Sequence, residues 1–163
     1  MDRILDDQLN RLNRDCIDYY LIHSVDLKTM NKLFKKGLIE FINDAKAAGK
    51  IKHIGFSYHG SKDEFEALVD SYDWEVVMVQ YNYFDENIQA SGDGIEYAAS
   101  KGIGIFVMEP LKGGILAGKM PDEAEEIFTK ANPNKSNAQW ALEWVLNNRN
   151  VTTVFSGMNS MEQ

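Results

Sequence analysis

The amino-acid sequence predicts an α/β fold in which about five parallel strands alternate with helices. Five apolar runs rich in β-branched residues recur along the chain and have the lengths of strands. The runs are mostly continuous, which is typical of parallel strands that are buried on both faces of a sheet. Segments with helical periodicity separate the runs, and this order predicts right-handed crossovers. The predicted strands are Cys16–His23, Ile51–Ser57, Val76–Tyr83, Ile103–Glu109 and Val151–Ser156.

Helix signals fill the intervals between these runs. Capping boxes, in which a serine and a residue three positions later satisfy the first N–H groups, are predicted at Ser61–Glu64 and Ser136–Gln139. Apolar residues follow both boxes at helical spacing. Gly49 stands where a left-handed residue would end a helix that begins near Leu38. Further helices are predicted before the first strand and over Asp122–Lys130.

Two arrangements of a parallel sheet fit this order: an open doubly wound sheet, or part of a (β/α)₈ TIM barrel. The first strand is not followed by G-x-G-x-x-G, so the doubly wound dinucleotide-binding fold lacks its main signal. A complete barrel needs eight strands and about 250 residues, whereas this chain has 163. We therefore expect residues 1–163 to form one domain, a partial TIM barrel that lacks N-terminal strands and a C-terminal segment.

Composition argues against several kinds of partner. The formal net charge is −8 and no Lys/Arg cluster occurs, so nucleic acid is not an expected ligand. No apolar run is long enough to cross a bilayer, and no secretory signal opens the sequence. With a single cysteine, Cys16, the expected compartment is the cytoplasm. The spacing of His, Asp and Glu residues indicates no metal site.

Polar side chains stand where three of the predicted strands end. These are His23, Ser57 and Gln80, and each shares strand parity with residues expected on one face. In parallel barrels the active site lies at the carboxyl ends of the strands. Taken singly, each residue is better explained as structural. Because the three recur in register, the sequence predicts a small-molecule site there.

Glycines follow the fourth and fifth predicted strands. The motif PLKGG, Pro110–Gly114, would let backbone N–H groups approach a ligand closely. The segment SGMNSMEQ, Ser156–Gln163, resembles the start of a helix, where amide groups suit a phosphate. Each motif is weak by itself.

Five blocks of the sequence carry a resemblance to a known family: DDQLNRLNRDCIDYYLIHSVD, AKAAGKIKHIGFSYHG, VVMVQYNYFDE, KGIGIFVMEPLKGG and VTTVFSGMNSMEQ. Together they resemble the aldo-keto reductases. The resemblance covers essentially the whole chain in the family's order, and it is closest to a bacterial branch whose members often carry a C-terminal ferredoxin-like domain. It implies a TIM barrel and NADPH-dependent reduction of aldehydes or ketones to alcohols, with NADH as the other cofactor to consider. An iron–sulfur cluster would belong to a further C-terminal domain.

The resemblance implies one catalytic residue and eight that contact the cofactor. His23 matches the histidine of the family's catalytic tetrad, which orients the substrate carbonyl. The cofactor-binding residues are Ser57 and Gln80 at the nicotinamide carboxamide, Leu111, Gly113 and Gly114 at the pyrophosphate, and Gly157, Asn159 and Gln163 at the adenosine phosphate.

Some family features have no counterpart in the sequence. Tyr58 stands where the family usually has asparagine, and Met108 stands where an aromatic residue usually stacks on the nicotinamide. The aspartate, tyrosine and lysine of the tetrad have no match, so we expect this chain to be inactive alone. A non-catalytic nucleotide-binding or regulatory module is the alternative. A third hypothesis is self-association of a half-barrel through its open edges.

Overall fold

The five predicted strands form one parallel sheet in the computed structural model, which describes residues 1–161. The spatial order β1-β2-β3-β4-β5 follows the order in the chain, and every neighbouring pair is parallel. This confirms the α/β fold and the partial barrel arrangement. The strands are β1 (Ile17–Ile22), β2 (Ile51–Tyr58), β3 (Val76–Gln80), β4 (Gly104–Met108) and β5 (Val151–Val154).

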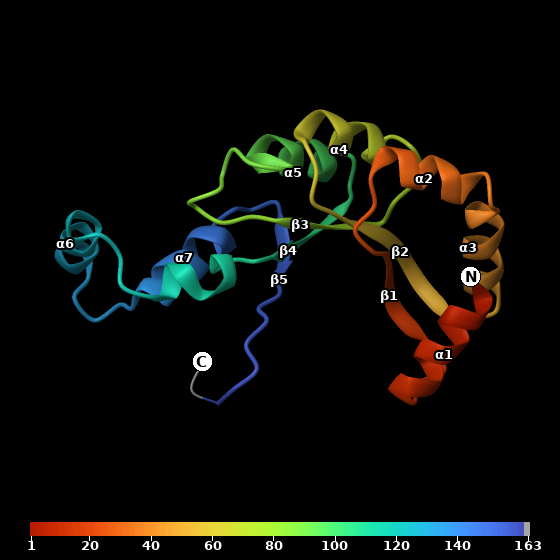
Figure 1. Cartoon of the computed structure of the whole chain (residues 1–163), viewed down its shortest axis with the longest axis horizontal. Coiled ribbons are helices and arrows are strands. Elements are labelled where there is room, and N and C mark those ends of the chain that lie inside the picture. The colour runs from red at the N-terminus through yellow and green to blue at the C-terminus, as the bar shows by residue number, and fades with distance from the viewer. Residues whose placement is uncertain (162–163) are drawn as a thin grey trace.

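Helices connect all of the strands. Figure 1 shows α2 to α5 along one side of the sheet, whereas α6 and α7 lie beyond β4 and β5. None of the helices in residues 1–161 has the length and apolar character needed to span a membrane. The helices are α1 (Asp2–Leu12), α2 (Leu27–Phe34), α3 (Leu38–Ala47), α4 (Lys62–Val69), α5 (Ser91–Ser100), the 3₁₀ helix η1 (Lys112–Ala117), α6 (Asp122–Ala131) and α7 (Asn137–Leu146).

The ends of two helices are as predicted. At the start of α7, Gln139 N–H donates to Ser136 Oγ at 3.2 Å, and Ser136 N–H donates to Gln139 Oε1 at 2.8 Å. This reciprocal pair confirms the capping box. After α3, Gly49 takes a φ of 69°, and the Lys50 N–H donates back to the Ala45 carbonyl at 2.9 Å. A left-handed residue therefore ends α3, as the glycine predicted.

The capping box predicted at Ser61–Glu64 is wrong. Ser61 does precede α4, but its side chain makes no capping hydrogen bond within the described part of the chain. The Glu64 carboxylate instead accepts from the Leu27 N–H and from the Tyr58 hydroxyl, both at 2.9 Å. Glu64 thus ties α4 to the start of α2 and the end of β2, because tertiary partners outcompete the local cap.

The two faces of the sheet differ in burial. The side chains beneath α2 to α5 have no solvent exposure, and they form the core: Ile54, Phe56, Val77, Val79, Ile105 and Val107. On the opposite face, Tyr19 is 49% exposed and its ring contacts His53 and Phe106. On this inner face the predicted burial is therefore wrong at the β1 edge, whereas Val76 of β3 and Phe106 of β4 are 1% and 6% exposed. Five strands do not close on themselves, so no second layer of residues 1–161 covers it.

A cluster of charged residues holds the amino-terminal end of the sheet. Glu75 precedes β3 and forms an ion pair with Lys46 of α3. Its other oxygen lies 2.7 Å from His53 Nδ1 on β2, and the Ile54 N–H donates to the carboxylate at 3.1 Å. Burial acts to raise the pKa of Glu75, but Lys46 and His53 outweigh it, so this pKa lies below its ordinary value.

Replacing Glu75 with glutamine should lower the free energy of unfolding at pH 7 by about 1 kcal/mol, as expected for a charged hydrogen-bond acceptor that is partly exposed. Because the folded-state pKa of Glu75 is depressed, its stabilisation is complete above the ordinary value and disappears as the pH falls through the folded value. The difference between the wild type and Glu75→Gln, measured by urea unfolding, should therefore shrink in acid.

Glu66→Gln is the matched control for this prediction. Glu66 has the same exposed fraction as Glu75, 34%, but its ion pair with Lys62 spans 4.0 Å. We expect its substitution to change stability by less than about 0.5 kcal/mol. Equal losses in the two variants would contradict a stabilising role for the Glu75 cluster.

Candidate active site

The three predicted site residues lie at one edge of the sheet. His23 follows β1, Ser57 is the penultimate residue of β2, and Gln80 ends β3. These strands are adjacent and parallel, so their carboxyl ends lie along the same edge. Gln80 pairs in register with Met108, the last residue of β4. The structure thus gathers the polar strand ends, whereas their roles stay predictions.

The hydroxyl of Ser57 holds the turn that carries His23. Ser57 is 5% exposed, and its Oγ accepts a hydrogen bond of 2.7 Å from the Ser24 N–H. Ser24 has a φ of 46°, and the next residue, Val25, donates its N–H to the Ser57 carbonyl at 3.1 Å. His23 itself is exposed. Its backbone is therefore fixed by β2, while the imidazole is left accessible.

Gln80 belongs to a buried polar cluster that the sequence analysis missed. Its Nε2 donates to Asp85 Oδ2 at 2.8 Å, and the same oxygen forms an ion pair with Lys112. Asp85 is 4% exposed and Gln80 is 6% exposed. The ammonium of Lys112 holds the pKa of the Asp85 carboxyl below its ordinary value. The charged pair therefore joins the end of β3 to the loop after β4.

Asn82 ends the third strand earlier than predicted. Its Oδ1 accepts from the N–H groups of Phe84 and Asp85 at 3.1 and 2.9 Å, which closes a turn. Its Nδ2 donates to the Glu109 carbonyl at 3.2 Å. The segment after Gln80 therefore leaves the sheet and packs against the loop that follows β4.

The PLKGG loop has a concentration of left-handed backbone. Three of its residues have positive φ, namely Lys112 (49°), Gly113 (65°) and Gly114 (94°), and so does Glu109 (55°) just before it. The Gly114 N–H donates to the Leu111 carbonyl at 2.9 Å. The resulting compact turn exposes glycine backbone without any Cβ, as close approach of a ligand requires.

A pocket of about 630 Å³ lies between this loop and the segment after β5. It places Leu111, Gly113, Gly114 and Gly157 together, and Ala138 of α7 forms part of its wall. Of the eight predicted cofactor-binding residues, these four share one cavity. The remaining four divide between the strand ends, where Ser57 and Gln80 lie, and the end of the chain, where Asn159 and Gln163 lie.

The segment after β5 differs from expectation. We expected the start of a helix at Ser156–Gln163, but residues 155–159 form no helix. The Phe155 N–H donates to the Val107 carbonyl at 2.8 Å, so pairing with β4 continues one residue past β5. Asn159 is exposed, and Gln163 lies outside the described residues.

Tyr58 does not point into the site. It is 1% exposed, and its ring lies 5.5 Å from that of Phe65. Its hydroxyl oxygen lies 2.8 Å from the Ser61 carbonyl oxygen and 2.9 Å from Glu64 Oε2, and both can accept its proton. Burial and the nearby Glu64 carboxylate raise the pKa of Tyr58. Tyr58 therefore belongs to the helix-covered core, because strand alternation turns it away from its neighbour Ser57.

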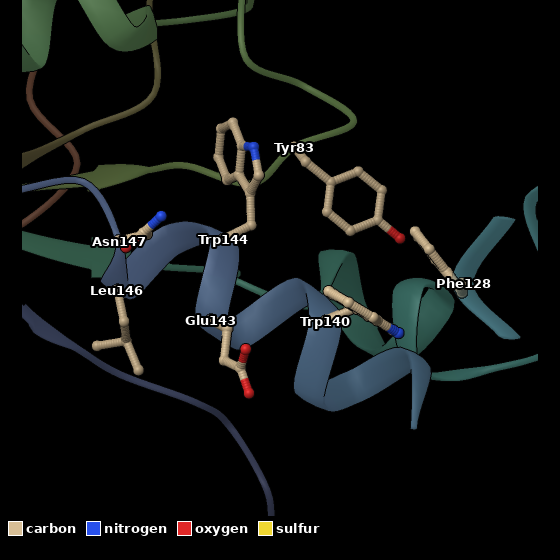
Figure 2. A pocket seen from close by; sticks show the side chains of 7 residues that line it. All are labelled: Tyr83, Phe128, Trp140, Glu143, Trp144, Leu146 and Asn147. Atoms are coloured by element: carbon tan, nitrogen blue, oxygen red, sulfur yellow. The ribbon is translucent and has the colours of Figure 1, made fainter. Parts of the chain in front are cut away.

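A second pocket of about 540 Å³ lies on the other side of α7. Figure 2 shows Trp140 and Trp144 on α7, beside Tyr83 and Phe128. The rings of Phe128 and Trp140 stack at 5.5 Å, and Trp144 lies 4.8 Å from Tyr81, the residue after Gln80. Helix α7 therefore separates the aromatic pocket from the pocket at the PLKGG loop.

Within residues 1–161, no group of three or more His, Cys, Asp or Glu side chains is arranged to hold a metal ion.

Comparison with known proteins agrees with the fold. The model of the Aldo/keto reductase family matches residues 1–163. The chain therefore belongs to the aldo/keto reductase family, whose members are oxidoreductases. It is 31% identical over 129 residues to "Aldo-keto reductase yakc [NADP(+)]" of Schizosaccharomyces pombe, across 77% of this chain and 36% of that protein.

Longer matches cover nearly the whole chain. It is 23% identical to the L-glyceraldehyde 3-phosphate reductase of Escherichia coli O157:H7, across 98% of this chain and 54% of that protein. Among solved structures, the aldo-keto reductase AKR11C1 from Bacillus halodurans in its holo form superimposes with a TM-score of 0.78 at 22% identity. That superposition covers 99% of this chain and 55% of the other. The chain thus spans about half the length of these relatives.

Proposed function

We propose that this chain is the cofactor-binding part of an NADPH-dependent aldo-keto reductase that reduces an aldehyde or ketone to an alcohol. The proposal rests on the residues at the carboxyl-terminal edge of the sheet, in a chain that belongs to this family. There, His23, Ser57 and Gln80 lie at the carboxyl ends of consecutive strands, and the glycine loop pocket lies beyond the fourth. Bound NADPH would supply the hydride.

The side chains at this edge fit the nicotinamide carboxamide. Gln80 directs its Nε2 to Asp85, so its Oε1 is available as an acceptor; no hydrogen bond to Oε1 is found in residues 1–161. Ser57 Oγ accepts from the Ser24 N–H and keeps its own proton for donation. Gln80 Oε1 could therefore accept from the NH₂ group of the carboxamide, and the Ser57 hydroxyl on the adjacent strand could donate to its carbonyl oxygen.

The loop pocket fits the phosphates. Its walls include Gly113, Gly114 and Gly157, so backbone groups can come close to a ligand without a side chain between them. Gly113 and Gly114 have left-handed φ, and backbone turns of this kind can present N–H groups to anions. We therefore assign the pyrophosphate to this loop and the adenosine phosphate to the segment from Gly157 onward.

His23 would act on the substrate. A neutral imidazole can donate a hydrogen bond to a carbonyl oxygen as negative charge develops there. Its exposure at the strand edge, on a turn fixed by Ser57, leaves it free to do so.

The proton donor would come from outside these residues. The tetrad aspartate, tyrosine and lysine have no match in residues 1–163, so we propose that the chain alone does not turn over. NADH in place of NADPH and self-association through the free edges of β1 and β5 stay predictions, as does a cytoplasmic location.

Titration of the purified chain with NADPH tests the cofactor assignment. We expect saturable quenching of tryptophan fluorescence, because α7 carries Trp140 and Trp144 and also contributes Ala138 to the wall of the loop pocket. Gly113→Val should weaken binding about tenfold or more by placing a side chain in the loop. Absence of saturable binding would remove the proposal.

Gly102→Val is the control for this substitution. Gly102 also has a positive φ, 79°, and a Cβ at either glycine would meet nothing within 4 Å. The two changes therefore introduce similar backbone strain, but Gly102 lies in the turn after α5, away from the pocket. We expect Gly102→Val to leave the dissociation constant for NADPH within about twofold of wild type.

A further inference from the structure

We infer that Asp85 and Lys112 are positioning residues, which fix the amide of Gln80 with its oxygen toward the nicotinamide and couple it to the PLKGG loop. This inference rests on the proposed function. Family membership does not by itself assign a role to either residue, and both lie outside the set of strand-end residues that the sequence singled out.

The Asp85 carboxylate sets the orientation of the Gln80 amide. An ionised carboxylate can only accept hydrogen bonds. The Asp85 oxygen that lies 2.8 Å from Gln80 must therefore face the NH₂ group, and the carbonyl oxygen of the amide must point the other way. With a neutral partner at position 85, either orientation of the amide could form a hydrogen bond. The charge of Asp85 thus decides which atom Gln80 presents to a ligand.

Neighbouring donors keep Asp85 charged although it is buried. A carboxylate that is 4% exposed needs compensation, because desolvation disfavours its ionised form. Lys112 supplies a full positive charge through the ion pair, and Asn82 Nδ2 lies 3.5 Å from the same oxygen. These two groups and Gln80 all present N–H donors to one carboxylate oxygen, so the ionised form is the one that fits.

The ion pair between Asp85 and Lys112 links the two ends of the proposed cofactor site. Lys112 lies between Leu111 and Gly113 in the loop assigned to the pyrophosphate, and its ammonium lies 4.9 Å from the centre of the Phe84 ring. Asp85 lies in the connection between β3 and α5. One ion pair therefore joins the loop to the strand end, so a change in either element is transmitted to the other.

Cofactor analogues test the amide orientation directly. The 3-acetylpyridine analogue of NADPH replaces the carboxamide NH₂ with a methyl group, so it cannot donate to Gln80 Oε1. Wild type should bind NADPH about five- to tenfold tighter than the analogue, the effect of one hydrogen bond. In Asp85→Asn this ratio should fall below about twofold, because the amide loses its fixed orientation. Lys112→Met should lower the ratio as well, and Lys112→Arg should restore it.

Asp122→Asn and Lys119→Met are the matched controls. Asp122 and Lys119 form an ion pair of 3.4 Å in which both side chains are more than 80% exposed. The pair lies in the connection from β4 to β5, after Lys112. Both control variants should keep the wild-type ratio. If Asp85→Asn keeps the wild-type ratio too, the inference is wrong. If wild type binds neither nucleotide, the proposed function fails and this inference fails with it.

Hydrogen exchange of the wild-type protein tests the inference even if the Asp85 variant does not fold. In a ¹⁵N-labelled sample, the NH₂ protons of Gln80 should exchange with solvent at least about tenfold more slowly than those of Gln139, because they are buried and bonded to a charged acceptor. Gln139 is exposed, and its Oε1 alone takes part in the α7 cap. Equal exchange rates for the two side chains would overturn the inference.

Discussion

Replacing Gly55 with alanine is expected to destabilise the sheet severely. Gly55 lies in the middle of β2, paired in register with Leu21 of β1 and with Val76 of β3. An added Cβ would lie 2.0 Å from the Val76 carbonyl oxygen and 2.7 Å from Val76 Cγ1. The nearer atom is backbone, so the clash can be relieved only by separating β2 from β3. We expect a loss of about 3 kcal/mol or more in the free energy of unfolding.

Gly104→Ala is the control for this effect. Gly104 also lies in a strand of the same sheet, and it pairs with Val76 from the opposite side. Its added Cβ would lie 3.5 Å from the Glu75 carbonyl oxygen, an ordinary contact. Stability should change by less than about 1 kcal/mol there. Thermal unfolding should show the Gly55 variant melting roughly 10 °C below wild type, and equal melting of the two variants would contradict the steric argument.

The layout of strands could be predicted from sequence because the apolar runs are mostly continuous and are separated by segments with helical periodicity. The ends of the strands were predicted less closely, because polar side chains that bond nearby backbone N–H groups set them and the apolar runs carry no record of this. Asn82 ends β3 by bonding two N–H groups ahead of it. The separate helix α2 was not predicted, although Asp26 is a local signal: its carboxylate accepts from the Thr29 N–H at 2.6 Å.

The candidate site divides in the same way. Strand parity was enough to select His23, Ser57 and Gln80, since alternation is a local property of the chain. Asp85 and Lys112 are 27 residues apart in sequence, and only the packing of two loops brings them together. Their side chains carry no periodic signal. Sequence reasoning therefore selected the groups that we propose to face a ligand, and it missed the pair that holds one of them.

His23→Ala is expected to lower turnover about a hundredfold or more in a reductase that combines this chain with the remaining tetrad residues. The side chain of His23 makes no hydrogen bond, ion pair or ring contact within residues 1–161, so its removal should leave the fold intact. The turn is held by backbone N–H groups that donate to Ser57, and these survive the substitution. The loss should therefore fall on the chemical step.

Steady-state reduction of an aldehyde by NADPH separates the two roles that this histidine could have. If His23 donates a hydrogen bond to the carbonyl in the transition state, kcat falls while the KM for NADPH changes less than about threefold. If it only supports the cofactor, the KM rises and kcat is preserved. His59→Ala is the control, because His59 is also exposed and follows the neighbouring strand β2. Wild-type turnover in the His23 variant would show that the strand-end histidine has no catalytic role.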